Sequence, residues 1–223
     1  MVRLVIFDLD GTLVDSETLN AQAYFELLPA LGLDIEAIRE RYHGMQYAAI
    51  IEDMQTLMCT PLPADLETRY RTRMAQLYQQ SLRPVAGISE VLPQIDKLLC
   101  VATNAPRAKT EHALAITGLR EHFADRLYSA YDIGAWKPSP RIFQHAALAL
   151  DMAPTDCIVV EDSVHGVTAA LAAGMQVLHY RPRTQPQPAG RVGYRAFHDM
   201  HDLPQLIAAV STTNAQTDGT TDE

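Results

Sequence analysis

Two carboxylates follow directly on a run of apolar residues near the start of the chain. In the stretch LVIFDLDGTLVDS, residues 4–16, Asp8 and Asp10 come after LVIF and just before a glycine. Such a pair could belong to a solvated turn held by Asx-type hydrogen bonds. It could also do chemistry, because one carboxylate can attack an electrophile while its neighbour transfers a proton. The pair by itself leaves both interpretations open.

Polar residues also follow three other apolar runs. Thr103 and Asn104 come after the second run, Lys137 lies in YDIGAWKPSP after the third, and Glu161 and Asp162 come after the fourth. Taken singly, they could be the start of a loop, a solvated lysine and acids beside a helix N-cap. In an open parallel sheet, ligands bind beyond the carboxyl ends of the strands, so these groups would meet at one edge. Their joint occurrence, each after a different run, favours a functional site.

The chemistry of this set points to a metal ion and a phosphate. Four carboxylates close together repel and raise one another's pKa. A hard divalent cation relieves that repulsion, and a site rich in oxygen favours Mg²⁺. The metal ion and Lys137 would neutralise a phosphate, while Thr103, backbone N–H groups and helix N-termini would bind its oxygens.

A parallel sheet is the element that would bring these residues together. Short apolar runs indicate five strands, with helical patterns between the later ones. Gly118 and Gly174 follow two of the helices, where they suit a helix C-cap. The alternation predicts an α/β fold whose parallel sheet is covered by helices on both faces. We expect strands at residues 3–7, 98–102, 126–129, 157–160 and 176–180, and helices at residues 107–117, 141–150 and 163–173.

The first part of the chain interrupts this alternation. Residues 17–82 contain four helical patterns and no convincing strand. A helical block inserted after the first strand predicts a separate bundle lying over the end of the sheet near Asp8. We therefore expect an α/β core domain at residues 1–15 and 85–210 and an α-helical cap domain at residues 16–84. The polar tail, residues 211–223, is expected to be disordered.

Composition narrows the class of protein. The 223 residues carry a net charge of -9, which argues against nucleic acid or an anionic membrane as a partner. No apolar stretch is long enough to span a bilayer, and the N-terminus lacks a signal-peptide pattern. The three cysteines, Cys59, Cys100 and Cys157, show no CxxC spacing. Cys100 and Cys157 lie in apolar runs and are expected to be buried free thiols. We expect a cytoplasmic monomer whose partner is a small molecule.

Four segments resemble the motifs of a known superfamily. DLDGTLVDS, VATN, WKPSP and VVEDSVHGV resemble the four motifs of the haloacid dehalogenase superfamily of phosphotransferases. The helical insertion is similar to that of the subclass with an α-helical cap, and the chain looks most like the β-phosphoglucomutase-like sugar phosphatases. The resemblance covers about residues 1–210. It implies a Rossmann-like core, Mg²⁺ dependence and an aspartyl-phosphate intermediate.

The resemblance also implies a role for each residue that matches a motif. Asp8 would be the nucleophile and a Mg²⁺ ligand, and Asp10 the general acid and base, with its backbone carbonyl on the metal ion. Thr103, Asn104 and Lys137 would bind the phosphoryl group. Asp162 would ligate Mg²⁺, with Glu161 beside it, directly or through water.

The same comparison separates the branches of the superfamily. Dehalogenases need neither the second aspartate nor the metal ion, so Asp10 and the acidic pair favour phosphorus chemistry. Phosphonoacetaldehyde hydrolases use a cap lysine, and β-phosphoglucomutases use a histidine in the first cap helix and a lysine deeper in the cap. This cap has Asn20 and no lysine. We expect a phosphatase for a small phosphorylated sugar, polyol or sugar acid such as a phosphogluconate. A phosphosugar mutase and a non-enzymatic phospho-ligand binding module remain the alternatives.

Substrate choice is expected to lie in the cap. The segment RYHGMQYAA resembles the substrate-specificity loop of the family, although its residues could equally be inter-helix packing residues. Arg69, Arg71 and Arg73 alternate, so not all of them can face the site, but one that does would suit a substrate carboxylate. The cap candidates for substrate binding are Asn20, His43, Gly44, Gln46 and Tyr47.

Overall fold

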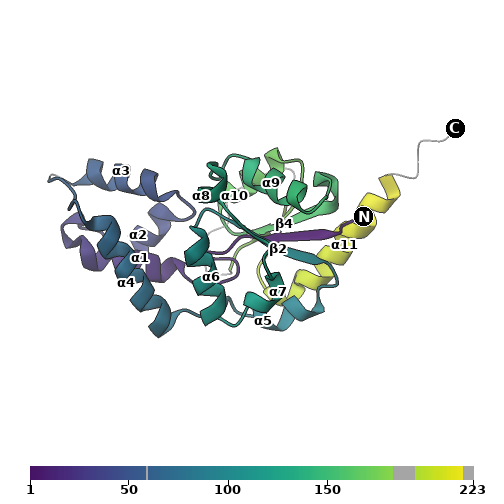
Figure 1. The fold of residues 1–223 in the computed structure, drawn as a ribbon, viewed down its shortest axis with the longest axis horizontal. Coiled ribbons are helices and arrows are strands. Elements are labelled where there is room, and N and C mark those ends of the chain that lie inside the picture. The colour runs from purple at the N-terminus through teal and green to yellow at the C-terminus, as the bar shows by residue number, and fades with distance from the viewer. Residues whose placement is uncertain (59, 183–193, 218–223) are drawn as a thin grey trace.

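A six-stranded parallel sheet forms the centre of the protein. The computed structural model describes residues 1–58, 60–182 and 194–217. The sheet has the order β3-β2-β1-β4-β5-β6, and each neighbouring pair is parallel. Figure 1 shows it edge-on, with helices above and below. The strands are β1 (Leu4–Phe7), β2 (Leu98–Thr103), β3 (Leu127–Ser129), β4 (Cys157–Glu161), β5 (Gln176–Tyr180) and β6 (Arg195–Phe197). The predicted α/β fold is confirmed.

Both faces of the sheet are buried under helices. Val5 and Phe7 of β1 belong to one apolar cluster, and Leu4 and Ile6 belong to a second cluster on the other face; all four are fully buried. This explains the unbroken apolar run of β1, since alternate side chains of a strand point to opposite faces. The first face is covered by α5 (Ile88–Val91), α6 (Arg107–Ile116), α7 (Arg120–Phe123) and α11 (Leu203–Thr217), and the second by α8 (Ala130–Ile133), α9 (Arg141–Ala149) and α10 (Val164–Ala172).

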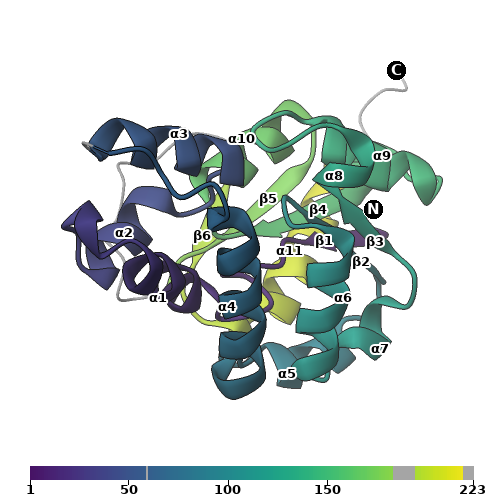
Figure 2. The same ribbon diagram turned by 60° about the vertical axis from the view of Figure 1, so that its left-hand side comes forward.

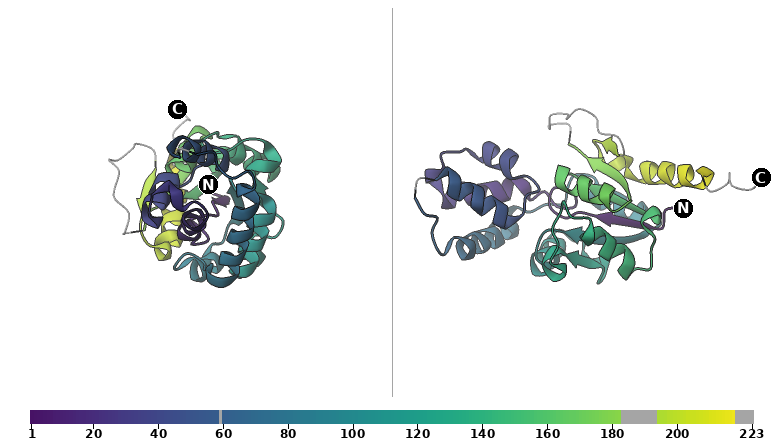
Figure 3. Two further views of the ribbon diagram at one scale, coloured as in Figure 1. Left: turned by 90° about the vertical axis from the view of Figure 1, so that its left-hand side faces the viewer. Right: turned by 90° about the horizontal axis from the view of Figure 1, so that it is seen from above.

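Four helices inserted after β1 form a bundle with its own apolar core. They are α1 (Glu17–Leu27), α2 (Ile35–Tyr42), α3 (Tyr47–Leu57) and α4 (Leu66–Ser81). Tyr24, Ile38 and Met54 lie at the centre of this core. The bundle sits beyond the carboxyl end of the strands, at the opposite end of the molecule from the N-terminus (Figures 1 and 3).

Two adjacent connections join the bundle to the sheet. The Asp15 N–H donates to the Arg83 carbonyl at 2.9 Å, and the Val85 N–H donates to the Leu13 carbonyl at 3.0 Å. The bundle therefore leaves and re-enters the sheet domain at one hydrogen-bonded point, and both connections lie close to Asp8 in the chain.

Two sequence predictions were wrong or incomplete. The tail was expected to be disordered from residue 211, but α11 runs on to Thr217, while residues 218–223 lie outside the described residues. The helix is already packed on the core through Leu203 and Ile207. Each further residue that joins it adds one backbone hydrogen bond, and polar residues can do this as well as apolar ones. Strand β6 was missed because its three residues form no apolar run.

The helices carry no membrane segment. Within the described ranges, none combines the length and the apolar character needed to cross a bilayer.

Candidate active site

A cavity of about 370 Å³ lies between the carboxyl end of the sheet and the helical bundle. Its floor contains the residues predicted after four strands: Asp8, Asp10, Thr103, Asn104, Lys137, Glu161 and Asp162. Parallel register explains the convergence, because Phe7 of β1 pairs with Val101 of β2 and Val160 of β4, so the strands end side by side.

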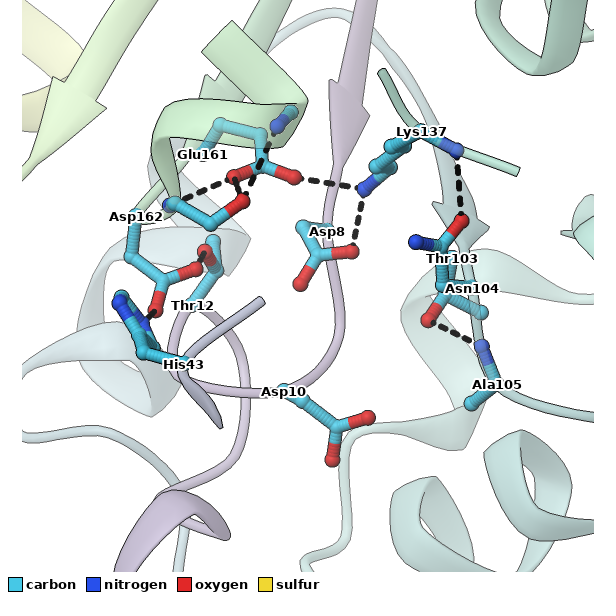
Figure 4. Close-up of polar contacts among 12 residues, drawn as sticks. Asp8, Asp10, Thr12, His43, Thr103, Asn104, Ala105, Lys137, Glu161 and Asp162 are labelled. Carbon is cyan, nitrogen blue, oxygen red and sulfur yellow. Dashed lines mark hydrogen bonds and ion pairs between the residues drawn. The ribbon is translucent and has the colours of Figure 1, made fainter. Parts of the chain in front are cut away.

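Lys137 bridges two of the buried carboxylates. Its ammonium donates to Asp8 Oδ1 at 2.5 Å and to Glu161 Oε1 at 2.6 Å (Figure 4). The other Glu161 oxygen, Oε2, accepts from the Ser163 N–H at 2.8 Å and from its hydroxyl at 2.9 Å. Burial opposes the charge of Lys137, but Asp8 and Glu161 outweigh it and raise the pKa of the ammonium. Both oxygens of Glu161 are thus engaged with protein donors.

Asp8 lies in a strongly acidic environment. Burial raises the pKa of Asp8 well above its ordinary value; Lys137 opposes this rise, and the charges of Glu161 and Asp162 add to it. The sequence analysis expected carboxylates gathered at one edge to raise one another's pKa, and Glu161 and Asp162 act on Asp8 in that direction.

Thr103 and Asn104 organise the loops beside Asp8. Thr103 Oγ1 accepts from the Ala105 N–H at 3.1 Å, and Asn104 Oδ1 accepts from the Lys137 N–H at 2.9 Å. Asn104 therefore ties the loop after β2 to the segment that carries Lys137. This contact could not be read from the sequence, because the two residues lie 33 positions apart.

Asp10 points away from this cluster (Figure 4). Its Oδ1 accepts from the Ser16 hydroxyl at 2.5 Å and from the Tyr78 hydroxyl at 3.3 Å. The Lys109 ammonium lies 3.0 Å from Oδ1 and 2.8 Å from Oδ2. Burial would raise the pKa of Asp10, but the charge of Lys109 and the hydrogen bonds from Lys109, Ser16 and Tyr78 outweigh burial and lower it.

Lys109 and Glu17 were missed by the sequence analysis. Lys109 stands in the first turn of α6, the helix that follows the Thr103–Asn104 motif, and this position was its only signal. Glu17, the first residue of α1, also lines the cavity.

His43 connects the bundle to the acidic cluster. Its Nε2 donates to Asp162 Oδ2 at 2.8 Å, while the Thr12 hydroxyl donates to Asp162 Oδ1 at 2.9 Å. Burial opposes the charge of His43, but the hydrogen bond and the charges of Asp162 and Glu17 outweigh it and raise the pKa of His43 to about 9. His43 thus contacts a core carboxylate from the cap.

The other cap candidates line the cavity, and one of the three arginines joins them. Asn20 Oδ1 accepts from the Tyr70 hydroxyl at 3.1 Å. Arg71 lines the cavity and pairs with Glu67, whereas Arg69 pairs with Asp65 on an exposed face. Gly44, Gln46 and Tyr47 also line the cavity.

A family model of haloacid dehalogenase-like hydrolases matches residues 2–174. The chain belongs to the haloacid dehalogenase-like hydrolases. It is therefore an enzyme, and the prediction of a phosphoric monoester hydrolase is confirmed. Hydrolases of this family generally use Mg²⁺.

Relatives of this haloacid dehalogenase-like hydrolase include sugar phosphatases. A 6-phosphogluconate phosphatase of Escherichia coli (strain K12) is 34% identical over 212 residues, covering 93% of this chain and 96% of that protein. Hexitol phosphatase B of the same strain is 29% identical over 195 residues, covering 84% and 87%. A solved haloacid dehalogenase-like protein of unknown function from Agrobacterium tumefaciens has a TM-score of 0.82 and 33% identity, covering 95% of this chain and 100% of that one.

Proposed function

We propose that this enzyme hydrolyses a small phosphorylated sugar, polyol or sugar acid, with 6-phosphogluconate as the first candidate. The observation that carries the proposal is the shared cavity, where a buried Asp8 held by Lys137 faces cap side chains suited to a polar substrate. Arg71 supports the sugar acid in particular, since a guanidinium binds a carboxylate well. The activity of the 34% identical relative agrees with this choice.

The oxygen donors on the cavity floor fit a magnesium ion. We propose the carboxylates of Asp8 and Asp162 and the backbone carbonyl of Asp10 as ligands, a hard oxygen set that suits Mg²⁺. Glu161 was predicted beside Asp162 at the metal ion, directly or through water, and its contacts with Lys137 and Ser163 support a second role in holding Lys137. Bound there, the ion would neutralise charge between Asp8 and the phosphate.

In the first step Asp8 acts as the nucleophile. A carboxylate oxygen of Asp8 attacks phosphorus, and the bond from phosphorus to the sugar oxygen breaks, with its electron pair going to that oxygen. Asp10 reacts from its protonated form and gives its proton to this oxygen, and the second step returns a proton to Asp10. Lys137 and Thr103 hold the phosphoryl oxygens, and Asn104 holds the backbone of Lys137 in place. The products are an aspartyl phosphate and the free sugar.

In the second step the aspartyl phosphate is hydrolysed. A water oxygen attacks phosphorus while Asp10, now a carboxylate, takes a proton from that water. The bond from phosphorus to the Asp8 oxygen breaks, and its electrons restore the carboxylate. Hydrolysis is favoured over a mutase because the cap, residues 16–84, contains no lysine, and Asn20 stands where a mutase would have histidine.

The organisation of the molecule is part of the proposal. We propose residues 1–15 and 85–210 as the core domain and residues 16–84 as the cap. The chain's own cap closes the cavity, which supports a monomer as the working unit. Cys100 and Cys157 are free thiols, which supports a reducing, cytoplasmic location.

Phosphate release from a panel of phosphorylated sugars, polyols and sugar acids tests the function. We expect the highest kcat/KM with 6-phosphogluconate, loss of activity in Asp8→Asn, and loss on chelation of divalent metal. Arg71→Met should raise KM for the sugar acid about tenfold and leave a hexitol phosphate almost unchanged, because one charge-assisted pair is removed. Arg69→Met is the matched control.

Each of these experiments has an outcome that would contradict one part of the proposal. The proposed function is wrong if no member of the panel releases phosphate. Unchanged activity in Asp8→Asn removes Asp8 as the nucleophile, and unchanged activity after chelation removes the metal ion. An equal effect of Arg71→Met on both substrates removes the carboxylate contact.

A further inference from the structure

The carboxylate of Asp10 is held by three side chains from three different segments. Ser16 precedes α1, Tyr78 belongs to α4, and Lys109 belongs to α6. Of these, only Lys109 contacts both carboxylate oxygens. Its ammonium also lies 5.8 Å from the centre of the Tyr78 ring, close to the line where α4 and α6 run side by side (Figure 2). Lys109 is therefore the central group of the network around Asp10.

The three partners of Asp10 do not all belong to the same part of the molecule: two lie in the cap and one lies in the core. Ser16 and Tyr78 lie in the inserted segment, at its first residue and in its last helix. Lys109 lies in a core helix, which packs on the sheet through Ala113 and Leu114, both fully buried. A change in the position of the cap would carry Ser16 and Tyr78 with it and leave Lys109 where it is.

We propose that Lys109 is the positioning residue of Asp10, holding its carboxylate from the core side. The inference rests on the acid and base role proposed above for Asp10. Lys109 fixes the orientation of the carboxylate that must reach first the sugar oxygen and then water. An ammonium bound to both oxygens restricts the rotation of a side chain that would otherwise turn freely about two bonds.

This arrangement gives a physical reason for hydrolysis within this chain. An acid and base held from the core keeps a core partner whether or not a sugar occupies the cap. It can therefore activate water against the aspartyl phosphate as soon as the sugar has left. In this cavity the residue that holds Asp10 comes from α6, and the cap supplies no lysine for the purpose.

The dependence of the rate on the leaving group tests the proposal. An alkyl phosphate releases a strongly basic alkoxide and needs the Asp10 proton, whereas p-nitrophenyl phosphate releases a stable phenolate. We expect Lys109→Met to lower kcat/KM about tenfold to a hundredfold for the best alkyl phosphate of the panel, and less than about threefold for p-nitrophenyl phosphate. Lys109→Arg should recover part of the loss. Lys97→Met makes the same change on the far side of the core and should leave both rates unchanged.

The Asp10→Asn variant separates this inference from the role on which it rests. Asp10→Asn should lose more activity on the alkyl phosphate than on the aryl phosphate, and adding Lys109→Met to it should cost nothing further, because Lys109 acts through Asp10. If Asp10→Asn affects both substrates equally, the acid role is wrong and the inference fails with it. If Asp10→Asn behaves as expected while Lys109→Met affects both substrates equally, affects neither, or adds to Asp10→Asn, only the role of Lys109 is wrong.

Discussion

Glu17 illustrates how single charges are balanced in this cavity. It is the first residue of α1 and lines the cavity, where the charges of His43, Asp162 and Asp10 act on it. Burial raises the pKa of Glu17 to about 7; His43 and Lys109 oppose the rise, and Asp162 and Asp10 add to it. A carboxyl group whose pKa is higher in the folded protein than in the unfolded chain lowers the stability of the fold at any pH where it is ionised.

We predict that Glu17→Gln stabilises the metal-free protein at high pH only. In the unfolded chain Glu17 ionises near its ordinary pKa of 4.5, and in the folded protein near 7. Between these values the wild type loses stability as pH rises, because the unfolded chain releases the proton first. Denaturant unfolding in a chelating buffer should show the variant about 1–3 kcal/mol more stable at about pH 8 and equal at about pH 4.

Glu26→Gln provides the control on the same helix. Glu26 is paired with Arg73, and this hydrogen bond lowers the pKa of Glu26, so its replacement should bring no gain at high pH. An equal stability of Glu17→Gln and wild type at both pH values would contradict the raised pKa.

At the scale of elements, the loop between α2 and α3 connects the cap directly to the core. Gly44 of this loop has a φ of +69°, and a Cβ added there would lie 2.5 Å from the Cβ of Ser163. Ser163 caps the N-terminus of α10 by accepting from the Gly166 N–H at 3.0 Å. With His43 bound to Asp162 beside it, this loop sets how closely the bundle approaches the cavity floor. The predicted specificity loop thus also acts as a contact between domains.

We predict that Gly44→Ala impairs catalysis more than folding. Both the left-handed backbone and the contact with Ser163 disfavour a methyl group there. The backbone effect costs about 1 kcal/mol. The contact would force the loop away from Ser163 and lower kcat/KM about tenfold or more, measured by phosphate release.

Gly32→Ala is the matched control for this variant. Gly32 also lies in the cap with a φ of +70°, but its added Cβ would meet nothing within 4 Å. The two variants should lose similar amounts of thermal stability, while Gly32→Ala keeps its kcat/KM. Equal kcat/KM values in the two variants would show that the contact with Ser163 does not matter for catalysis.

At the scale of the whole molecule, the sheet is closed to solvent on both faces. Cys100 of β2 and Cys157 of β4 lie on either side of β1 in the cluster under α9 and α10, and both are fully buried. Burial raises the pKa of the Cys100 thiol and raises that of Cys157 to about 11. The predicted free thiols are confirmed for these two residues, and Cys59 lies outside the described residues.

We predict that both thiols react only when the sheet opens. In a Cys59→Ser variant, a disulfide reagent such as DTNB should react with the two thiols of the folded protein at the rate at which the protein unfolds. In denaturant, where both thiols are exposed, the reagent should react with both of them immediately. Reaction of one thiol within seconds in the folded protein would show local opening at that strand.

Much of the fold followed from local patterns in the sequence. Apolar runs that are buried on both faces can only be central strands, so β1, β2 and β4 were predicted to within one residue at each end. Polar residues placed directly after such strands must meet at the carboxyl edge, and Asp8, Thr103 and Asp162 do so. The short strand β6 was not predicted, because its three residues do not form an apolar run.

The pairing of side chains was decided only by the tertiary structure. The sequence placed Glu161 with the metal ligands, but the folded chain turns both its oxygens toward Lys137 and Ser163. In the folded chain, Arg71 is the one of the three alternating arginines that lines the cavity. Lys109 contacts Asp10 although the two residues lie 99 positions apart in the sequence. The physical reason is that a strand pattern determines where a loop starts, whereas contacts across the cavity depend on the paths of several loops and helices at once. By itself, therefore, the sequence determined the sheet and the residues at its carboxyl edge. The packing of the cap on the core decided which of these side chains contact one another.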